Sequence, residues 1–544
     1  MSQLPNSPFV RTSNPHLSRW QSVVMDKVCE RIQKENPGME IHEVRALALR
    51  DPMVIGVHLH VEEHNENQKS SADDAVGKAE TAATAAPPAD STDTPLHIKH
   101  YQASKEFYAF MAKQMQPDGQ RPINKDTGEP VMFIPDPGPD DKPRTFPDTD
   151  SNYAAWAVAG TEWTNFANPL PSPYVDWRTQ VPPHVNPNSF VSTFNVFTIK
   201  DNAKVVILGD YGTGLTDGII MLMSILVNQK PDYIIHIGDV YYSGTGSETA
   251  AYVNMFTQAF KATGMKVPVF SIPGNHEYMS GGAPFFEQVL QMNKNNGFPQ
   301  YAQTASYFCL RNESNTIQFL SMDTGVNSVN AYLPNGLTAA YSPWLWYSEM
   351  EWIWDKLNSF KNGKTILLSH HQLFSVSGVI NDGNNVVWVA PGSGMDKLQF
   401  MNGNLYNALS PYFGQVAAWF WGHEHLLCIY QDGQLGLKKG RLIGNSGYEQ
   451  WDKDGGYTPL TNKFKYGTFA QLDITRVQWW TQYSPVKFHN QTSFYNHGWA
   501  YLGITGGNVH ASYWQFPVMD PDITTLPPVG QLAEPLPFNF SEDF

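Results

Sequence analysis

From about residue 195, short apolar segments that suit buried strands alternate with segments that have helical spacing. The strand-like runs include residues 205–208, 233–237 and 267–272, and the pattern continues to a run at 416–422. Such a rhythm predicts a mainly buried sheet whose faces are covered by helices. The sequence therefore predicts an α/β architecture for this part of the chain.

The length of 544 residues favours more than one structural unit. Residues 66–95 are rich in Ala, Ser, Thr, Asp and Pro, and they carry almost no large apolar side chain that could offset the entropy of ordering. We expect a linker there. The predicted units are an N-terminal α+β region at 1–120 containing that low-complexity linker, a Pro-rich irregular connection at 121–194, the main α/β domain at 195–480, and C-terminal strands and a tail packing on it at 481–544.

Two elements are predicted near the N-terminus. Residues 16–36 have the apolar spacing of an amphipathic helix. Residues 53–61 (MVIGVHLHV) end in the alternation of a half-buried strand, with His58 and His60 on one face. A histidine pair at this spacing can bind a metal, but a solvated strand face is the favoured interpretation. A further helix is expected at 97–116.

Charge and composition limit the classes of function. With 36 basic and 51 acidic residues the formal net charge is −15, which disfavours nucleic acid as a partner. The longest apolar run, residues 218–227, is shorter than the ~20 residues that span a bilayer, and the first residues lack an apolar signal segment. The three cysteines form no CxxC pair, so a disulfide framework or thiolate metal site is not expected. We expect no membrane span and a cytoplasmic location.

Polar side chains follow the predicted strands at five points. Because loops at the carboxyl ends of strands meet in one crevice of an α/β sheet, we expect these residues to converge. Their carboxylate, imidazole and amide groups suit Fe, Mn or Zn, and a carboxylate can bridge two ions about 4 Å apart. The residues are Asp210 in GDYGTG, Asp239 in GDVYYSG, Asn275 and His276 in PGNHE, His370 and His371 in SHH, and His423 and His425 in GHEH.

The ordered set GDYG, GDVYY, GNHE, SHH and GHEH resembles the metallophosphoesterase (calcineurin-like phosphoesterase) superfamily over about residues 200–450. This resemblance implies a four-layer αββα sandwich. Most members have DxH in the first motif, whereas this chain has Gly212 at the histidine position. The purple acid phosphatase branch shares this departure and supplies a tyrosine from a GDxxY motif instead. The matching phenol is Tyr242, and Tyr241 is expected to be a packing residue.

The same resemblance implies a dinuclear centre that contains Fe(III) and a divalent ion (Fe, Zn or Mn). Asp239 would bridge both ions, and His276 and His371 would act on the phosphate or the leaving group, His371 being the weaker candidate. Asp323 matches a carboxylate that the family uses structurally. The implied ligands are Asp210, Asp239, Tyr242 and His425 for Fe(III), and Asp239, Asn275, His370 and His423 for the second ion.

The sequence thus predicts a phosphoric ester hydrolase resembling acid phosphatases, in which a metal-bound hydroxide attacks a small phosphate monoester. One alternative is a phosphodiesterase that uses the same metals on nucleotides or lipid head groups. Another is an effector protein whose N-terminal region binds a partner, with the metal site secondary. The loop at 374–400 is interpreted either as a lid over the site or as a plain surface excursion. The substrate, the divalent metal and the oligomeric state are not predicted.

Overall fold

The protein is described here from a computed structural model. The described residues are 10, 12, 15–51, 54–58, 61–62, 193–280, 282–326, 328, 343, 345, 347–374, 402–448, 477–480, 483–487, 493–518 and 523–544. The predicted linker at 66–95, the helix at 97–116, the connection at 121–192, His60 and the loop at 375–400 lie outside these residues.

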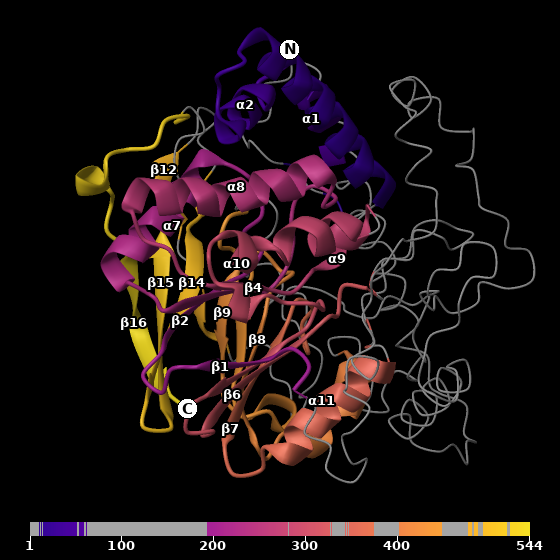
Figure 1. Ribbon diagram of the computed structural model, residues 1–544, viewed down its shortest axis with the longest axis vertical. Coiled ribbons are helices and arrows are strands. Elements are labelled where there is room, and N and C mark those ends of the chain that lie inside the picture. Colours follow the sequence, from indigo (N-terminus) through magenta and orange to yellow (C-terminus); the bar gives the residue numbers. More distant parts are fainter. Residues whose placement is uncertain are drawn as a thin grey trace, which may run out of the picture.

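Two sheets form the centre of the molecule (Figure 1). In the first, three parallel strands are extended by antiparallel strands from the C-terminal part of the chain. Its order is β16 (Leu536–Asp543), β15 (Asn508–Phe516), β14 (His497–Thr505), β2 (Lys204–Leu208), β3 (Tyr233–His236) and β4 (Val269–Ser271). The C-terminal strands join this sheet in antiparallel fashion, since β14 pairs with both β15 and β2.

The second sheet contains a parallel group, β6, β7, β8 and β10, with antiparallel pairs on either side. Its order is β1 (Val196–Ile199), β5 (Cys309–Asn312), β6 (Ile317–Met322), β7 (Lys364–Ser369), β8 (Val416–Trp421), β10 (Gly440–Ile443), β9 (Leu427–Tyr430) and β11 (Val477–Trp480). A separate antiparallel pair joins β12 (Tyr483–Lys487) and β13 (Ser493–Tyr495).

Alternation along the strands explains the layers. In β2, Val205 and Ile207 lie in the core between the two sheets, whereas Val206 and Leu208 pack beneath α7 (Thr216–Gln229) and α8 (Gly246–Thr263). Because both faces are buried, the strand reads as a continuous apolar run. Helix α8 begins with a capping box, in which Thr245 accepts from the Glu248 backbone N–H.

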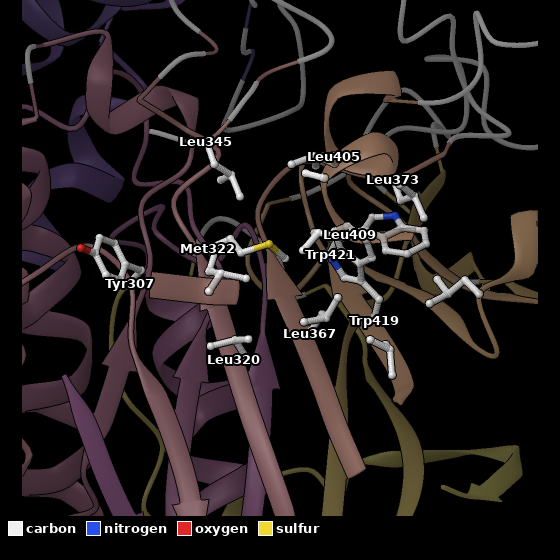
Figure 2. Close-up of a cluster of buried hydrophobic side chains, with 14 of the residues drawn as sticks. Tyr307, Leu320, Met322, Leu345, Leu367, Leu373, Leu405, Leu409, Trp419 and Trp421 are labelled. Carbon is white, nitrogen blue, oxygen red and sulfur yellow. The ribbon is translucent and has the colours of Figure 1, made fainter. Parts of the chain in front are cut away.

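The outer face of the second sheet is covered in the same way. Leu320, Leu367, Trp419 and Trp421 point from its strands into the apolar cluster shown in Figure 2. Helices α11 (Tyr347–Ser359) and α12 (Gly403–Leu409) complete this layer. The arrangement is helix, sheet, sheet, helix, so the predicted four-layer αββα sandwich is confirmed.

Shorter elements complete the described chain. These are the helices α9 (Asn275–Tyr278) and α10 (Met292–Asn295), a π-helical turn at Phe285–Val289, and 3-10 turns at Pro299–Tyr301, Ser410–Tyr412, Gln434–Gly436 and Val529–Gln531. None of the helices in the described segments is long and apolar enough to cross a bilayer.

The N-terminal residues pack on the helices of the first sheet. Helix α2 (Ile41–Ala48) packs against α7 and α8, and helix α1 (Pro15–Glu35) packs against α2, at one end of the molecule (Figure 1). The predicted helix at 16–36 is confirmed. The prediction of a strand at 53–61 is wrong, because residues 54–58 and 61–62 are helical.

The apolar spacing explains this correction. Val54, Val57 and Val61 are buried in one cluster, and their intervals of three and four residues are helical. The alternation in VHLHV therefore predicts the wrong element, and the helical spacing of the valines predicts the right one. His58 is also buried, not solvated.

Candidate metal centre

Buried polar residues gather where strands of both sheets end. Asp210 follows β2, Asp239 follows β3, and Asn275 begins α9 just after β4. The histidines of the SHH and GHEH motifs follow β7 and β8 in the second sheet. The predicted residues that converge here are Asp210, Asp239, Asn275, His276, His370, His371, His423 and His425, and all but the half-buried His423 are buried.

Three side chains form one group, which we name the Tyr241 group: Asp210, Tyr241 and His425. The Tyr241 hydroxyl lies 2.8 Å from Asp210 Oδ1 and 2.9 Å from His425 Nε2. His425 Nε2 is in turn 3.2 Å from Asp210 Oδ1. A carboxylate, a phenol and an imidazole thus meet through atoms that can each bind a metal.

A second trio, the Asn275 group, consists of Asn275, His370 and His423. The Asn275 Oδ1 atom lies 3.1 Å from His370 Nε2 and 3.0 Å from His423 Nδ1. These two ring nitrogens are only 3.2 Å apart. His370 donates its other ring N–H, at Nδ1, to the Ile237 carbonyl at 3.0 Å, which directs the Nε2 lone pair into the group.

Asp239 lies between the two groups. Its Oδ1 is 3.3 Å from His370 Nε2, and its Oδ2 accepts a hydrogen bond from the Tyr241 hydroxyl at 3.2 Å. The two oxygens of this carboxylate therefore face different groups, one the Asn275 group and the other the Tyr241 group.

The positions of the adjacent tyrosines are the reverse of the sequence-based expectation. Tyr242, the expected ligand, directs its hydroxyl to His58 Nε2 at 2.8 Å, away from the carboxylates. Tyr241, the expected packing residue, reaches them. The cause is backbone pairing between the two motif loops: Tyr241 N–H donates to the Gly212 carbonyl at 3.0 Å, and Gly212 N–H donates to the Asp239 carbonyl at 3.2 Å. This pairing fixes the residue after Val240 against the first loop.

The backbone adopts conformations here that ordinary residues rarely use. Asp210, Asp239 and His423 have positive φ values of 55°, 76° and 71°. Left-handed backbone at non-glycine residues costs of order 1–3 kcal/mol each and concentrates at functional sites. Gly274 leaves the space that the carboxylate needs, since a Cβ there would lie 2.1 Å from Asp239 Oδ1.

The charges in the site depend on one another. Burial would raise the pKa of Asp239, but His370 and His276 outweigh it and hold that pKa well below its usual range. Burial opposes charge on His370, but Asp239 raises the pKa of His370 to about 9. Burial and the Asp239 charge raise the pKa of Glu277 well above its ordinary value. A cation bound at His370 Nε2 would therefore have to displace a proton from that ring.

The two histidines with expected catalytic roles are held outside the two groups. The backbone N–H of His276 donates to Asp239 Oδ1 at 3.1 Å, and its ring N–H at Nδ1 donates a hydrogen bond to the Tyr242 carbonyl oxygen. His371 Nδ1 lies 3.0 Å from the Thr324 hydroxyl, and burial lowers the pKa of His371 well below its ordinary value. Asp323 accepts a hydrogen bond from the Tyr278 hydroxyl at 2.5 Å, in keeping with a structural role.

Sequence reasoning missed three contributions to the site. Tyr241 was excluded because counting along a motif cannot tell which of two adjacent phenols turns inward. Glu277 accepts from the Gly274 N–H at 2.8 Å and so shapes the turn that presents Asn275; its position in GNHE was a usable signal. Contacts from the N-terminal helices had no signal in the motifs at all.

The donor set could hold metal. Two clusters, which overlap at His370, each offer three ligand atoms within 4.8 Å of one another: Asp210 with Asp239 and His370, and His370 with His371 and His423. The family model for calcineurin-like phosphoesterases matches residues 203–427, which span this convergence of strand ends. The chain carries a calcineurin-like phosphoesterase domain.

This phosphoesterase domain has remote structural likenesses. Plasmodium GAP50, the anchor in the inner membrane complex, is 12% identical and covers 62% of this chain and 89% of its own, with a TM-score of 0.36. A dimetal phosphatase from Danio rerio is 8% identical and covers 58% and 96%, with a TM-score of 0.34. Phosphopantetheinyl hydrolase from Mycobacterium tuberculosis is 14% identical and covers 46% and 91%, with a TM-score of 0.27. Likenesses this weak carry no argument about activity. No curated protein sequence matches the chain.

Proposed function

We propose that the phosphoesterase domain hydrolyses small phosphate monoesters at a dinuclear centre of Fe(III) and a divalent ion, with Tyr241 as the phenolate ligand. The observation that carries this proposal is the Tyr241 hydroxyl, which lies within hydrogen-bonding distance of Asp210, Asp239 and His425. Gly212 leaves the first motif without a histidine, and Tyr241 supplies a ligand atom in its place.

Each group would hold one ion. Asp210, Tyr241 and His425 would hold Fe(III), Asn275, His370 and His423 would hold Fe, Zn or Mn, and Asp239 would serve both. A bound metal pair supplies positive charge for the phosphate and lowers the pKa of water. Carboxylates and a phenolate favour the trivalent ion, whereas an amide and two neutral imidazoles suit a divalent one.

The remaining residues would bind and protonate the ester. The Tyr242 carbonyl fixes the ring of His276, whose Nε2 lies 3.8 Å from Asp239 Oδ2 at the edge of both groups. From there His276 would give a proton to the departing oxygen. His371, close to His423 with ring centroids 4.4 Å apart, would contact the phosphate.

A matched pair of variants tests the proposal. Tyr241→Phe and Tyr242→Phe each remove one hydroxyl and keep the ring. A phenolate bound to Fe(III) absorbs visible light, so iron-loaded wild-type protein should be pink to purple. Tyr241→Phe should abolish the band and weaken iron retention by more than about tenfold, because loss of a residue that only supports a ligand already costs that much. Tyr242→Phe should keep the band.

Rates on a nitrophenyl phosphate monoester and the corresponding diester complete the experiment. Faster hydrolysis of the monoester is expected, and preference for the diester would favour the phosphodiesterase alternative. A colourless iron-loaded wild type would exclude the Fe(III)–phenolate centre. Loss of the band in Tyr242→Phe alone would exclude Tyr241 as the ligand. If the wild type hydrolyses neither ester faster than Asp239→Ala does, the effector alternative is favoured.

A further inference from the structure

The N-terminal helices contact the back of the metal centre. Their apolar cluster includes Val28 and Val44, and it closes over Tyr241, Tyr242 and Tyr448 from the phosphoesterase domain. Tyr448 lies against His425, with ring centroids 4.0 Å apart. The described part of the N-terminal segment is thus in contact with the Tyr241 group itself.

Arg45, on α2, reaches both loops that carry acidic ligand candidates. Its Nη2 donates to the Thr213 carbonyl at 3.0 Å and to the Tyr241 carbonyl at 3.5 Å. Thr213 stands three residues after Asp210, and Tyr241 two residues after Asp239. The guanidinium therefore spans the seam at which the two loops pair through Gly212.

Ser18, on α1, contacts the same loop one residue further on. Its hydroxyl donates to the Tyr242 carbonyl at 2.7 Å. That carbonyl oxygen also accepts the hydrogen bond from His276 Nδ1. Ser18 and the proposed proton donor, His276, therefore share one acceptor, the Tyr242 carbonyl oxygen.

We propose that Arg45 and Ser18 are positioning residues for the hydrolytic reaction, holding the Tyr241 loop from behind. The inference rests on the proposed function and adds to it: the N-terminal segment is part of the catalytic apparatus. Arg45 aligns Asp210 with Tyr241, and Ser18 fixes the carbonyl that orients His276. Both side chains contact backbone carbonyls of the loops, and neither belongs to the two ligand groups.

The environment of Arg45 favours this role over a purely stabilising one. The side chain is 3% exposed, and its guanidinium donates to backbone carbonyls of the two loops. The buried Glu248 carboxylate is nearby, since Arg45 and Glu248 act with opposite sign on the pKa of the Tyr242 hydroxyl. Taking a charge out of water is costly for folding. Space is nevertheless reserved for it, since a Cβ on Gly214 would lie 2.8 Å from Arg45 Nε. The fold accepts a desolvated cation where it meets two motif loops.

The test compares Arg45→Met with Arg31→Met in the full chain. Met keeps much of the length of the side chain without its charge. Arg31 lies on α1 and pairs with Asp51 at the surface. Its variant is the control, because it removes an N-terminal arginine that pairs at the surface instead of with the loops. Arg45→Met should lower kcat roughly 10–100-fold and weaken metal retention by a similar factor, with little change in KM. Arg31→Met should match wild type.

Two readouts separate positioning from folding. The visible band of the iron-loaded protein should shift in Arg45→Met, and Arg45→Lys should restore part of kcat because it can still donate to the carbonyls. Ser18→Ala removes only a hydroxyl and should lower kcat several-fold. Because it also loses two buried hydrogen bonds, to the Tyr242 carbonyl and from the Ser243 hydroxyl, the melting temperature should fall but the protein should stay folded at the assay temperature. If Arg45→Met does not fold, Ser18→Ala decides the matter.

The inference is overturned if Arg45→Met and Ser18→Ala keep the wild-type kcat, metal affinity and spectrum, or if the losses in Arg45→Met and Arg31→Met are equal. Failure of the proposed function looks different. In that case the wild type hydrolyses no phosphoester. The metal affinities of Arg45→Met and Arg31→Met, measured with Mn²⁺ or Zn²⁺ alone, still test whether Arg45 positions the Tyr241 loop.

Discussion

The two ligand groups are similar in size but differ in what supports them. The Asn275 group is held by the phosphoesterase domain: His370 donates to Ile237, and Glu277 braces the turn before Asn275. The Tyr241 group depends in addition on distant residues. Arg45 contacts the Tyr241 carbonyl from 196 positions away in the sequence, and Ser18 contacts the Tyr242 carbonyl from 224 positions away.

This difference shows that a side chain on a motif loop can be positioned in two ways. A ligand that follows a buried strand is positioned by the sheet, so strand register and one second hydrogen bond suffice. Tyr241 lies two residues beyond Asp239, where the chain has left the sheet, and it needs partners from another segment. We infer that the Asn275 group tolerates changes in the N-terminal helices better than the Tyr241 group does.

The largest effects should come from removing one side chain of either group, and the two groups should respond differently. His425→Ala should lose iron, colour and activity down to the level of Asp239→Ala. His423→Ala and Asn275→Ala should keep the colour, lose the exchangeable divalent ion, and recover part of their activity when divalent metal is added, because the Fe(III) ligands are intact. Metal content, visible spectra and metal-titrated rates provide the measurements.

This comparison fails if His423→Ala and Asn275→Ala retain both ions with wild-type affinity. It also fails if His423→Ala and His425→Ala lose colour equally, because the two groups would then not hold separate ions.

The next effect concerns His276, which lies at the edge of both groups. His276→Ala should lower kcat for alkyl phosphates by roughly 10²–10⁴-fold, the usual range for a lost general acid. The loss should be smaller for nitrophenyl phosphate, whose leaving group needs no proton, and metal content should be unchanged. Steady-state rates on both esters measure the difference. Equal losses on both would indicate that His276 binds phosphate instead.

The sequence predicted what depends on local pattern. Apolar runs followed by Asp210, Asp239, Asn275 or the histidines located the strands and predicted that these residues lie together, because burial on both faces makes parallel strands easy to recognise. It could not choose between Tyr241 and Tyr242. That choice depends on pairing between two loops, which no single motif contains.

The N-terminal segment was less predictable for two reasons. Residues 53–61 satisfy a strand alternation and a helical spacing at once, and only packing of Val54, Val57 and Val61 against the cluster decides between them. The contacts of Ser18, Arg45 and His58 join residues more than 160 positions apart. Composition and periodicity contain no information about such pairs.

The smallest expected effect tests whether the N-terminal contact with the Tyr241 loop responds to acid. Burial lowers the pKa of His58 to about 3, and His58 Nε2 lies 2.8 Å from the Tyr242 hydroxyl. The unfolded chain, with a histidine pKa near 6.5, binds more protons than the folded one between about pH 3 and pH 6.5. The stability contributed by neutral His58 is therefore present above pH 6.5 and is lost as the pH falls towards 3.

Between pH 7 and pH 5 this single group should cost about 2 kcal/mol of unfolding free energy. The glutamine of His58→Gln cannot titrate but still accepts from the Tyr242 hydroxyl. Between pH 7 and pH 5, the urea-unfolding free energy of this variant should therefore fall by about 2 kcal/mol less than that of the wild type. Tyr242→Phe keeps the buried imidazole and should retain the wild-type slope. If His58→Gln has the wild-type slope, His58 is not buried in its neutral form, and the contact between the N-terminal segment and the Tyr241 loop is looser than the structure indicates.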